Sequence, residues 1–372
     1  MMIIGPICRV FGRLIMKNHK KSRTMLLIIC AVIGTLLLTG CSNDAKSDTR
    51  IIKDCSGAEV EISTNIQKVI APHPPFVSFM IAMGEGDKLV GTHGAVIAHT
   101  WAPYFKEDVT EVEQYGYKPD AEILLAADVD LVVVKNPAYA ETLRNAGIPA
   151  IYFGYNNIEE LYYAVDLMGE IFGKDAKAYA EKWKANLEKT ISTLNEEVGS
   201  LPDGEKKSVY YINGAVNPSN VYTTYGGGTF TEYWINTIGG NFATSSFEDI
   251  EEIDPEVAIS LNPGVIFISG YSEHTRYDEL MADPLWTDID AVKNGEIYLM
   301  PTSLVSFDRF AVELPLLLDY SASVLYPDKH EFGGIDAMRS FFEEYYGKSF
   351  SDGELNYMLL GLSPDGSRMD AE

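Results

Sequence analysis

Apolar residues occur in short runs that alternate with amphipathic stretches along the chain from Lys68 onward. The runs predict strands at residues 69–71, 88–91, 131–134, 150–153, 208–212, 265–268 and 296–300. The stretches between them predict helices at residues 76–83, 120–127, 138–146, 229–238 and 255–261. Because Val- and Ile-rich strands separated by helices are typical of parallel sheets, the pattern predicts an α/β fold, with two α/β lobes around central, mostly parallel sheets.

One amphipathic stretch, residues 175–198, is longer than the others. Its apolar positions follow spacings of three and four and form a single stripe: Ala176, Tyr179, Ala180, Trp183, Leu187, Ile191, Leu194 and Val198. No Gly or Pro interrupts it, and at about 1.5 Å per residue it spans roughly 36 Å. We therefore expect a single long, rigid helix over residues 173–200. It joins an N-terminal lobe (51–172) to a C-terminal lobe (201–372) and limits their movement.

Two segments of the chain align with each other without gaps, residues 122–133 and residues 256–267. Each opens with Glu, continues as a short helix and a turn, and ends as a buried strand. A repeated unit of this kind predicts two lobes related by pseudo-symmetry. The alternative is chance similarity, since all helix–strand units share this order of elements.

The first 40 residues have the features of an export signal. They contain six basic residues and no acidic one, followed by an apolar run over residues 25–38 and then Leu-Thr-Gly before Cys41. That run is shorter than the roughly 20 residues of a membrane-spanning helix. We expect a lipoprotein signal peptide (1–40), a lipid on Cys41 and a flexible tether (41–50) that holds the protein outside the cytoplasm. The alternatives are a signal anchor with an incidental Cys, and a true start at Met16.

The charge of the chain excludes several classes of partner. The net charge is −25, and without residues 1–40 the chain has 23 Lys and Arg against 54 Asp and Glu, a net charge of −31. Such acidity repels nucleic acid and anionic lipid. Of the four cysteines, only Cys55 lies outside the signal and the lipidation site, so no disulfide framework is expected.

Five segments in this order resemble the class III periplasmic-type binding proteins, which feed ABC importers of iron–siderophore, haem and cobalamin complexes. They are residues 66–71 (IQKVIA), 83–91 (MGEGDKLVG), 118–125 (KPDAEILL), 256–267 (EVAISLNPGVIF) and 283–298 (DPLW through AVKNGEIY). The chain departs from the family pattern at 128–130, where the family has a Pro-Asp pair, and at Gly264, where it has Asp.

The resemblance implies a monomeric binding subunit that is not an enzyme and that delivers its ligand to a permease with its ATPase. In the family, one surface glutamate on each lobe docks on the permease, and by position these correspond to Glu122 and Glu256. The alternative is that each is an ordinary first-turn glutamate that interacts favourably with its helix dipole.

Candidate ligand-binding residues follow the predicted strands, because ligands of open α/β sheets bind at the carboxyl ends of the strands. In the N-terminal lobe these are His73, Trp101, Lys135 and Asn136. His73 could instead stand beside a helix N-cap, and Trp101 could belong to the core.

In the C-terminal lobe, Tyr222 and Tyr225 lie in or beside a glycine-rich stretch before a helix whose N-terminus favours an anion. Tyr271 and Arg309 also follow predicted strands. Arg309 offers a planar donor for an anion, or pairs with Asp308 or Glu313.

The leading hypothesis is therefore capture of a metal chelate of the iron–siderophore, haem or corrinoid type between the lobes. The alternatives are a bare oxyanion such as molybdate or tungstate, and a bare metal ion. The five histidines outside the signal form no metal-like spaced pair. A lipid-anchored hydrolase is a remote alternative, because the chain has neither a Gly-x-Ser-x-Gly nor a His-Glu-x-x-His motif. We expect no catalytic residues and no resident cofactor.

Overall fold

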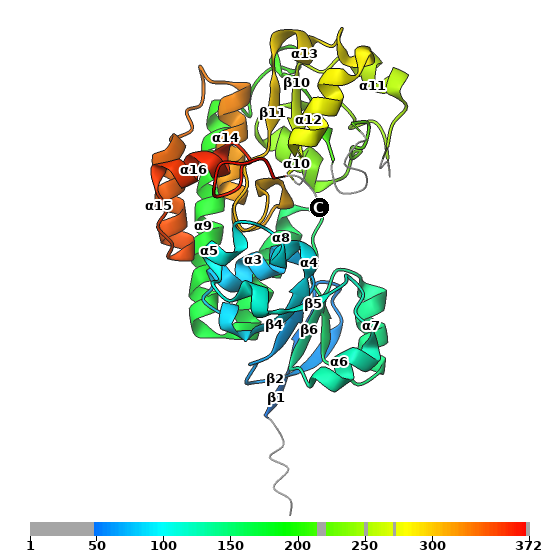
Figure 1. The fold of residues 1–372 in the computed structure, drawn as a ribbon, viewed down its shortest axis with the longest axis vertical. Coiled ribbons are helices and arrows are strands. Elements are labelled where there is room, and N and C mark those ends of the chain that lie inside the picture. The colour runs from blue at the N-terminus through cyan, green and yellow to red at the C-terminus, as the bar shows by residue number, and fades with distance from the viewer. Residues whose placement is uncertain (1–47, 214–220, 249–251, 271–272, 370–372) are drawn as a thin grey trace, which may run out of the picture. The chain divides into compact units, whose positions relative to one another are not determined.

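Two parallel sheets organise the chain (Figure 1), whose computed structural model describes residues 48–213, 221–248, 252–270 and 273–369. The first sheet has the strand order β5-β4-β3-β6-β7 and the second β11-β10-β8-β9, with parallel pairing throughout. We call the part built on the first sheet the N-terminal lobe and the part built on the second sheet the C-terminal lobe. The strands are β3 (Val69–Ala71), β4 (Leu89–His93), β5 (Glu113–Tyr115), β6 (Leu131–Val134), β7 (Ala150–Tyr152), β8 (Ser208–Ile212), β9 (Asn241–Phe242), β10 (Val265–Ile268) and β11 (Ile297–Leu299).

Helices cover both faces of the first sheet because β3 and β6, at its centre, are apolar at every position. Alternate residues of a strand point to opposite faces, so Leu131 and Val133 of β6 pack in one apolar cluster while Val132 and Val134 pack in another. The helices of this lobe are α3 (Pro74–Ala82), α4 (Gly94–Ile97), α5 (Ala102–Phe105), α6 (Ala121–Ala127), α7 (Pro137–Asn145) and α8 (Ile158–Phe172).

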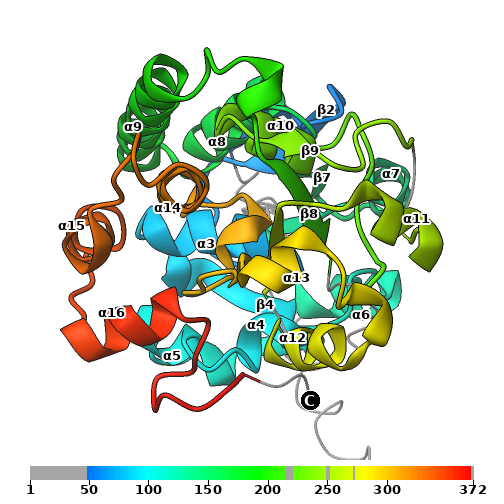
Figure 2. The same ribbon diagram turned by 90° about the horizontal axis from the view of Figure 1, so that it is seen from above.

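The second sheet has the same layered construction. Val265 and Phe267 of β10 join the large core, whereas Ile266 and Ile268 face a separate cluster. Helices α11, α12 and α13 lie on the side of β8 away from α9 and α14 (Figure 2). The helices of this part are α10 (Phe230–Thr237), α11 (Pro255–Leu261), α12 (Glu273–Ala282), α13 (Asp290–Asn294), α14 (Leu314–Leu325), α15 (Gly334–Tyr346) and α16 (Asp352–Leu359).

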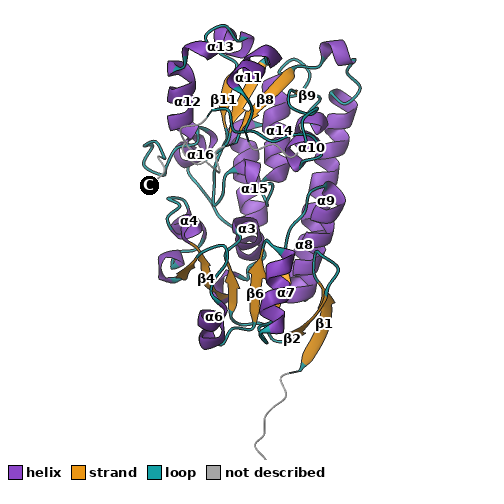
Figure 3. Ribbon diagram, turned by 90° about the vertical axis from the view of Figure 1, so that its right-hand side faces the viewer, coloured by secondary structure: helices purple, strands orange, loops and turns teal. Residues whose placement is uncertain are grey.

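The long helix predicted between the lobes is present as α9 (Lys174–Glu197), an unbroken helix of 24 residues. It packs against α8 on one side and against α14 and α10 farther along (Figure 3). Trp183, at its middle, is fully buried, packs edge-on against Phe79 of α3, and donates a 2.8 Å hydrogen bond to the carbonyl of Val312. One side chain of α9 therefore contacts both lobes, and truncating such a buried Trp costs about 3–5 kcal/mol.

The gapless internal alignment corresponds to two units with the same local geometry, α6–β6 and α11–β10. Asp120 and Asp254 are the N-caps, and each side chain accepts a hydrogen bond from the backbone N–H of the following glutamate, Glu122 or Glu256. Each helix ends at a residue in the left-handed conformation, Asp128 with φ 49° and Asn262 with φ 40°. The short side chains of Asp and Asn tolerate this conformation. The two helices therefore begin and end with the same local geometry.

Several elements carried no clear pattern in the sequence. An antiparallel hairpin of β1 (Thr49–Lys53) and β2 (Glu59–Ser63) forms a third small sheet. Helix α15 and the segment after α16 contact the N-terminal lobe, although they follow the C-terminal sheet in the chain. Phe105 of α5 packs against Phe342 and Tyr346, and the indole N–H of Trp101 donates to the carbonyl of Leu362 at 2.8 Å.

Candidate ligand-binding site between the lobes

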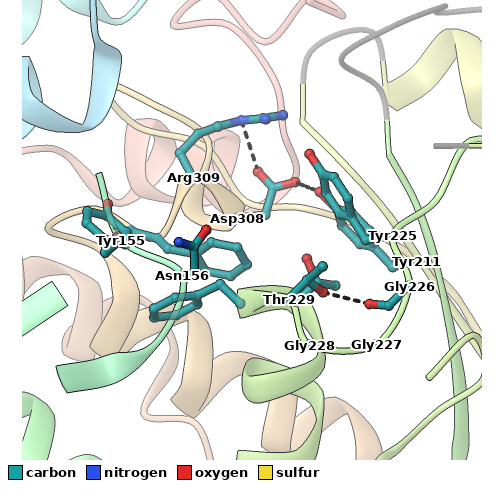
Figure 4. A pocket seen from close by; sticks show the side chains of 13 residues that line it. Tyr155, Asn156, Tyr211, Tyr225, Gly226, Gly227, Gly228, Thr229, Asp308 and Arg309 are labelled. Atoms are coloured by element: carbon teal, nitrogen blue, oxygen red, sulfur yellow. Dashed lines mark hydrogen bonds and ion pairs between the residues drawn. The ribbon is translucent and has the colours of Figure 1, made fainter. Parts of the chain in front are cut away.

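A pocket of about 430 Å³ lies where loops of the two lobes meet (Figure 4). Tyr155 and Asn156, which follow β7, line it from the N-terminal lobe. The other lining residues belong to the C-terminal lobe: Tyr211, Tyr225, Gly226, Gly227, Gly228, Thr229, Phe230, Thr231, Asp308, Arg309 and Phe310. Its volume falls in the usual range for small-molecule sites, about 300–1,000 Å³.

The glycine-rich loop forms one wall of the pocket and leads into α10. Thr229 is the N-cap, and its hydroxyl accepts from the N–H of Glu232 at 3.4 Å and donates to the carbonyl of Gly226 at 2.9 Å. Gly228 has φ +73°, and an added Cβ at Gly227 would collide with the carbonyl of Ser245. These glycines are therefore required for the path of the loop, which brings backbone atoms to the pocket surface.

Arg309 is held at the pocket by a buried carboxylate and by the end of β10. Its Nε lies 3.6 Å from Oδ1 of Asp308, and one of its terminal nitrogens donates to the Ser269 hydroxyl at 2.8 Å. The carboxylate of Asp308 itself accepts hydrogen bonds from the hydroxyls of Tyr211 at 2.6 Å and Ser306 at 2.5 Å. The Arg309–Asp308 pair expected as one alternative is thus present, and Arg309 also lines the pocket.

Aromatic rings supply most of the remaining lining. Tyr211 and Tyr225 are stacked, with ring centroids 6.0 Å apart and 13° between the planes, as Figure 4 shows. Phe230 and Phe310 also line the pocket, and their ring centroids are 4.6 Å apart. The hydroxyl of Tyr155 donates to the carbonyl of Phe310 at 2.8 Å, a direct hydrogen bond between the lobes.

A second cation approaches from the N-terminal sheet. Lys135 follows β6, and both its partial burial and the positive charge of Arg309 lower the pKa of its ammonium group. An anion bound near both groups would offset the repulsion between their charges. The arrangement therefore suits an anionic ligand.

A buried acidic residue, Glu273, lies at the start of α12. Glu273 is fully buried, and burial raises the pKa of its carboxyl group to about 8, with a further contribution from Asp308. Arg276, also on α12, donates to the carbonyl of Ser269 at 3.2 Å. Two arginines therefore contact Ser269. Arg276 bonds its backbone carbonyl, and Arg309, which lines the pocket, bonds its hydroxyl.

Residues 69–304 match the family model described as periplasmic binding protein. The chain belongs to the periplasmic binding protein family. This confirms the class III resemblance, and the two-lobed α/β architecture with its long helix confirms the predicted fold class.

Three relatives of this binding protein are informative. It is 24% identical over 316 residues to an uncharacterized ABC transporter substrate-binding lipoprotein, YvrC of Bacillus subtilis, covering 80% of this chain and 95% of that one. It is 22% identical to the molybdate-binding protein MolA of Haemophilus influenzae (87% and 97% covered) and to the Fe(3+)-citrate-binding protein YfmC of Bacillus subtilis (72% and 86%). The solved structure of MolA bound to molybdate matches with a TM-score of 0.71 at 18% identity, covering 81% of this chain and 99% of that one.

The structure of this binding protein places two of the eight predicted ligand residues, Tyr225 and Arg309, in the pocket lining. Lys135 does not line the pocket, although the charge of Arg309 lowers the pKa of its ammonium group. Asn136 is exposed and caps α7, where its side chain accepts from the N–H of Tyr139 at 2.8 Å. Tyr222 lies elsewhere, since its hydroxyl donates to Asp283 at 2.5 Å. Tyr271 and the predicted lipidation site Cys41 lie outside the described residues.

The other two predicted residues are buried. His73 is the N-cap of α3, and its Nδ1 accepts from the N–H of Phe76 at 3.4 Å. Burial and the charge of Lys135 lower the pKa of His73 to about 4, so the ring is neutral at pH 7 with its proton on Nε2. Trp101 is fully buried against Tyr104 and Phe350 and does not line the pocket.

Sequence reasoning missed several residues that line the pocket. Tyr155 and Asn156 lie three and four residues after the end of β7, so the strand-end rule could have identified them. Phe230 and Phe310 had no such signal, because apolar residues beside a loop resemble core residues.

Within the described residues, no group of three or more His, Cys, Asp and Glu side chains is arranged to hold a metal ion. The same residues contain no helix long and apolar enough to span a membrane.

Proposed function

We propose that this periplasmic binding protein is the extracytoplasmic solute-binding subunit of an ABC importer and captures an anionic metal chelate in the pocket between its lobes. The observation that carries the proposal is Arg309 in the lining of an aromatic pocket, with Lys135 as a second cation whose pKa the charge of Arg309 lowers. In a chain whose net charge is −25, two cations that act on each other in this part of the molecule are a specific feature. They offset negative charge on the ligand, while the aromatic rings contact its organic part.

The size of the pocket favours a chelate over a bare oxyanion. A tetrahedral oxyanion occupies only a small part of about 430 Å³. The lining combines the Asp308–Arg309 pair with five aromatic rings. Those rings would have little contact with a small hydrated ion. The names of two relatives support an anionic cargo, since molybdate and ferric citrate both carry negative charge. Molybdate remains the second candidate because MolA is similar along nearly all of its length.

The partner proposed for the loaded protein is the importer permease, with its ATPase. Glu122 and Glu256 are both exposed, and both stand at the second position of helices with the same caps. Two carboxylates at equivalent positions of the two lobes suit a two-point electrostatic contact. A lipid on Cys41 would hold the protein at the outer face of the membrane, and the lipoprotein relative YvrC supports this part of the proposal.

Calorimetric titration of the purified protein with ferric citrate and, separately, with sodium molybdate tests the proposal. We expect the ferric complex to bind and Arg309→Gln to weaken it about 10- to 100-fold, because charge-assisted hydrogen bonds contribute about 1.5–3 kcal/mol. Arg339→Gln is the matched control, since Arg339 pairs with Asp336 and Asp352 on α15 and α16.

The outcomes separate the candidates. Binding of molybdate but not of the ferric complex would favour the oxyanion function. If the protein bound neither, or if Arg309→Gln bound the ferric complex as tightly as the control variant, the proposed function would be wrong.

A further inference from the structure

One residue of the pocket lining has a strained backbone. Among the described residues, three that are not glycine have a positive φ: Asp128, Asn262 and Phe310. The short polar side chains of Asp128 and Asn262 tolerate this left-handed conformation. Phe310 has φ 53° and ψ 41°, and its bulky aromatic side chain disfavours them. A residue in such a conformation persists only where the surrounding contacts fix it.

Ring contacts account for an aromatic residue at this position. The ring of Phe310 lies 4.6 Å from that of Phe230 and 6.1 Å from that of Trp234, both on α10. Glycine would adopt the same backbone conformation without cost, but it would remove these contacts and part of the pocket lining. The protein therefore keeps an aromatic lining together with a strained backbone.

The backbone carbonyl of Phe310 is held from the other lobe. It accepts the 2.8 Å hydrogen bond from the hydroxyl of Tyr155, which follows β7 of the N-terminal lobe. This carbonyl belongs to the peptide group directly after the strained residue, so its direction depends on ψ of Phe310. A change to the right-handed conformation would turn the carbonyl away from Tyr155. The hydrogen bond between the lobes therefore stabilises the left-handed conformation.

Phe310 also joins two anchored parts of its loop. Before it, Arg309 donates to the Ser269 hydroxyl at 2.8 Å and lines the pocket. After it, the carbonyl of Val312 accepts a 2.8 Å hydrogen bond from the indole of Trp183 on α9. Because Val312 is tied to the long helix, a change of backbone conformation at Phe310 redirects the chain that carries Arg309.

We propose that Phe310 is a positioning residue for Arg309, and that the hydrogen bond from Tyr155 makes this positioning depend on the distance between the lobes. The inference rests on the proposed function, because it describes how the captured anion is released. While the lobes are together, Tyr155 holds Phe310 in the left-handed conformation and Arg309 faces the pocket. When the permease separates the lobes, the hydrogen bond breaks, Phe310 relaxes, and Arg309 withdraws from the anion.

A small movement of the lobes is enough for this release. A hydrogen bond of 2.8 Å is lost when its donor and acceptor move about 1 Å farther apart. Such a movement is compatible with the unbroken helix α9. The left-handed conformation of a residue other than glycine corresponds to about a five- to thirty-fold cost in an equilibrium. Once Tyr155 no longer offsets this cost, the conformation that presents Arg309 becomes less populated and the anion binds more weakly.

Calorimetric titration of the purified protein with ferric citrate and with sodium molybdate tests the role of Tyr155. Tyr155→Phe keeps the ring and removes the hydroxyl, and it should weaken the ligand that the wild type binds about three- to ten-fold. Tyr163→Phe is the matched control, because the Tyr163 hydroxyl donates at 3.0 Å to the Lys53 carbonyl within the N-terminal lobe. The control variant should bind as the wild type does.

Two substitutions at position 310 separate the backbone conformation from the ring. Phe310→Gly and Phe310→Ala both remove the ring, but only glycine adopts the left-handed conformation freely. Tyr155→Phe should therefore weaken binding about three- to ten-fold in the Phe310→Ala protein and less than about two-fold in the Phe310→Gly protein. In the Arg309→Gln protein, Tyr155→Phe should have little further effect, because the hydrogen bond acts through Arg309.

Urea unfolding of the ligand-free variants measures the strain without any ligand. The unfolding midpoint of Phe310→Gly should exceed that of Phe310→Ala by about 0.3 M, because the left-handed conformation strains alanine and not glycine. A Phe310→Ala midpoint equal to or above that of Phe310→Gly would show that the position is not strained and would refute the inference.

The binding outcomes distinguish this inference from the proposed function. If Tyr155→Phe bound as tightly as Tyr163→Phe, the inference would be refuted while the proposed function stood. Equal effects of Tyr155→Phe in the Phe310→Gly and Phe310→Ala proteins would refute it in the same way. If the wild type bound neither ferric citrate nor molybdate, the proposed function itself would fall, and the release mechanism with it.

Discussion

The buried carboxyl group of Glu273 predicts an unusual dependence of stability on pH. The side chain is fully buried at the start of α12, and neither of its oxygens has a hydrogen-bond partner among the described residues. The charged groups that act on it are Asp308, Arg276 and Arg309. Burial is the largest cause of the rise in its pKa from 4.5 to about 8, so the folded protein keeps this carboxyl protonated at neutral pH.

The sign and size of the effect follow from linkage between proton binding and folding. Below pH 4.5 the group is protonated in both the folded and the unfolded chain. As the pH rises toward 8, only the unfolded chain loses the proton, so the stability that the protonated group contributes decreases and is lost once the pH passes the folded-state pKa. At about 1.4 kcal/mol per pKa unit, the full effect is at most about 5 kcal/mol.

Urea unfolding of the ligand-free protein at pH 5 and pH 9, followed by tryptophan fluorescence, measures this effect. Glu273→Gln is uncharged at every pH. Its free energy of unfolding should exceed that of the wild type by less than about 1 kcal/mol at pH 5 and by several kcal/mol, up to about 5, at pH 9. Glu279→Gln changes an exposed residue of the same helix and serves as the control. If wild type and Glu273→Gln lost stability in parallel, within about 1 kcal/mol, the reasoning about this burial would be refuted.

Three further predictions concern His330, Gly270 and helix α9. The ring nitrogens of His330 lie 2.6 Å from a carboxylate oxygen of Glu197 on α9 and 2.8 Å from one of Asp319 on α14. His330→Ala should therefore lower the free energy of unfolding by about 3 kcal/mol, and a loss below about 1 kcal/mol would contradict this. An added Cβ at Gly270 would collide with the Ser306 side chain, whereas one at Gly264 would meet only the Ser208 carbonyl at 3.7 Å. Gly270→Ala should therefore weaken ferric-chelate binding about ten-fold through displacement of Arg309, while Gly264→Ala should not; equal affinities would count against this. Because α9 is unbroken and Trp183 contacts both lobes, the radius of gyration from small-angle scattering should change by less than about 1 Å on ligand binding, and a fall of several ångströms would show that the connection bends.

The sequence carried enough local information to predict the sheets and the long helix. Residues 131–134 and 265–268 are apolar at every position, and the structure has β6 and β10 at those bounds. The predicted helix over residues 173–200 corresponds to α9, which begins one residue later and ends three residues earlier. These elements were predictable because their patterns depend only on burial and periodicity within one segment.

The features of the fold that were not predicted depend mainly on contacts between distant parts of the chain. Trp101 is buried because Phe350 and the Leu362 carbonyl, about 250 residues later in the chain, pack against it. No local pattern shows that α15 and the segment after α16 return to the N-terminal lobe. Strand β5 is only three residues long, Glu113–Tyr115, and two of these are polar and exposed, so it lacked the apolar run of the other strands.

The site was predictable only in part for the same reason. The chemistry of Arg309 and its place after a strand pointed to the pocket. Tyr222 and Tyr225 lie in the same stretch of sequence, yet one bonds Asp283 and the other lines the pocket.

Anomalous X-ray diffraction tests most directly the central claim that an anionic cargo is held between Lys135 and Arg309. Crystals of the protein loaded with the ferric complex or the molybdate that binds in titration should be measured at the absorption edge of the metal. The account predicts one strong peak in the pocket, between the ammonium of Lys135 and the guanidinium of Arg309 and bordered by Tyr155 and Tyr225. A fully occupied peak elsewhere, with neither cation in contact with the bound ligand, would contradict it.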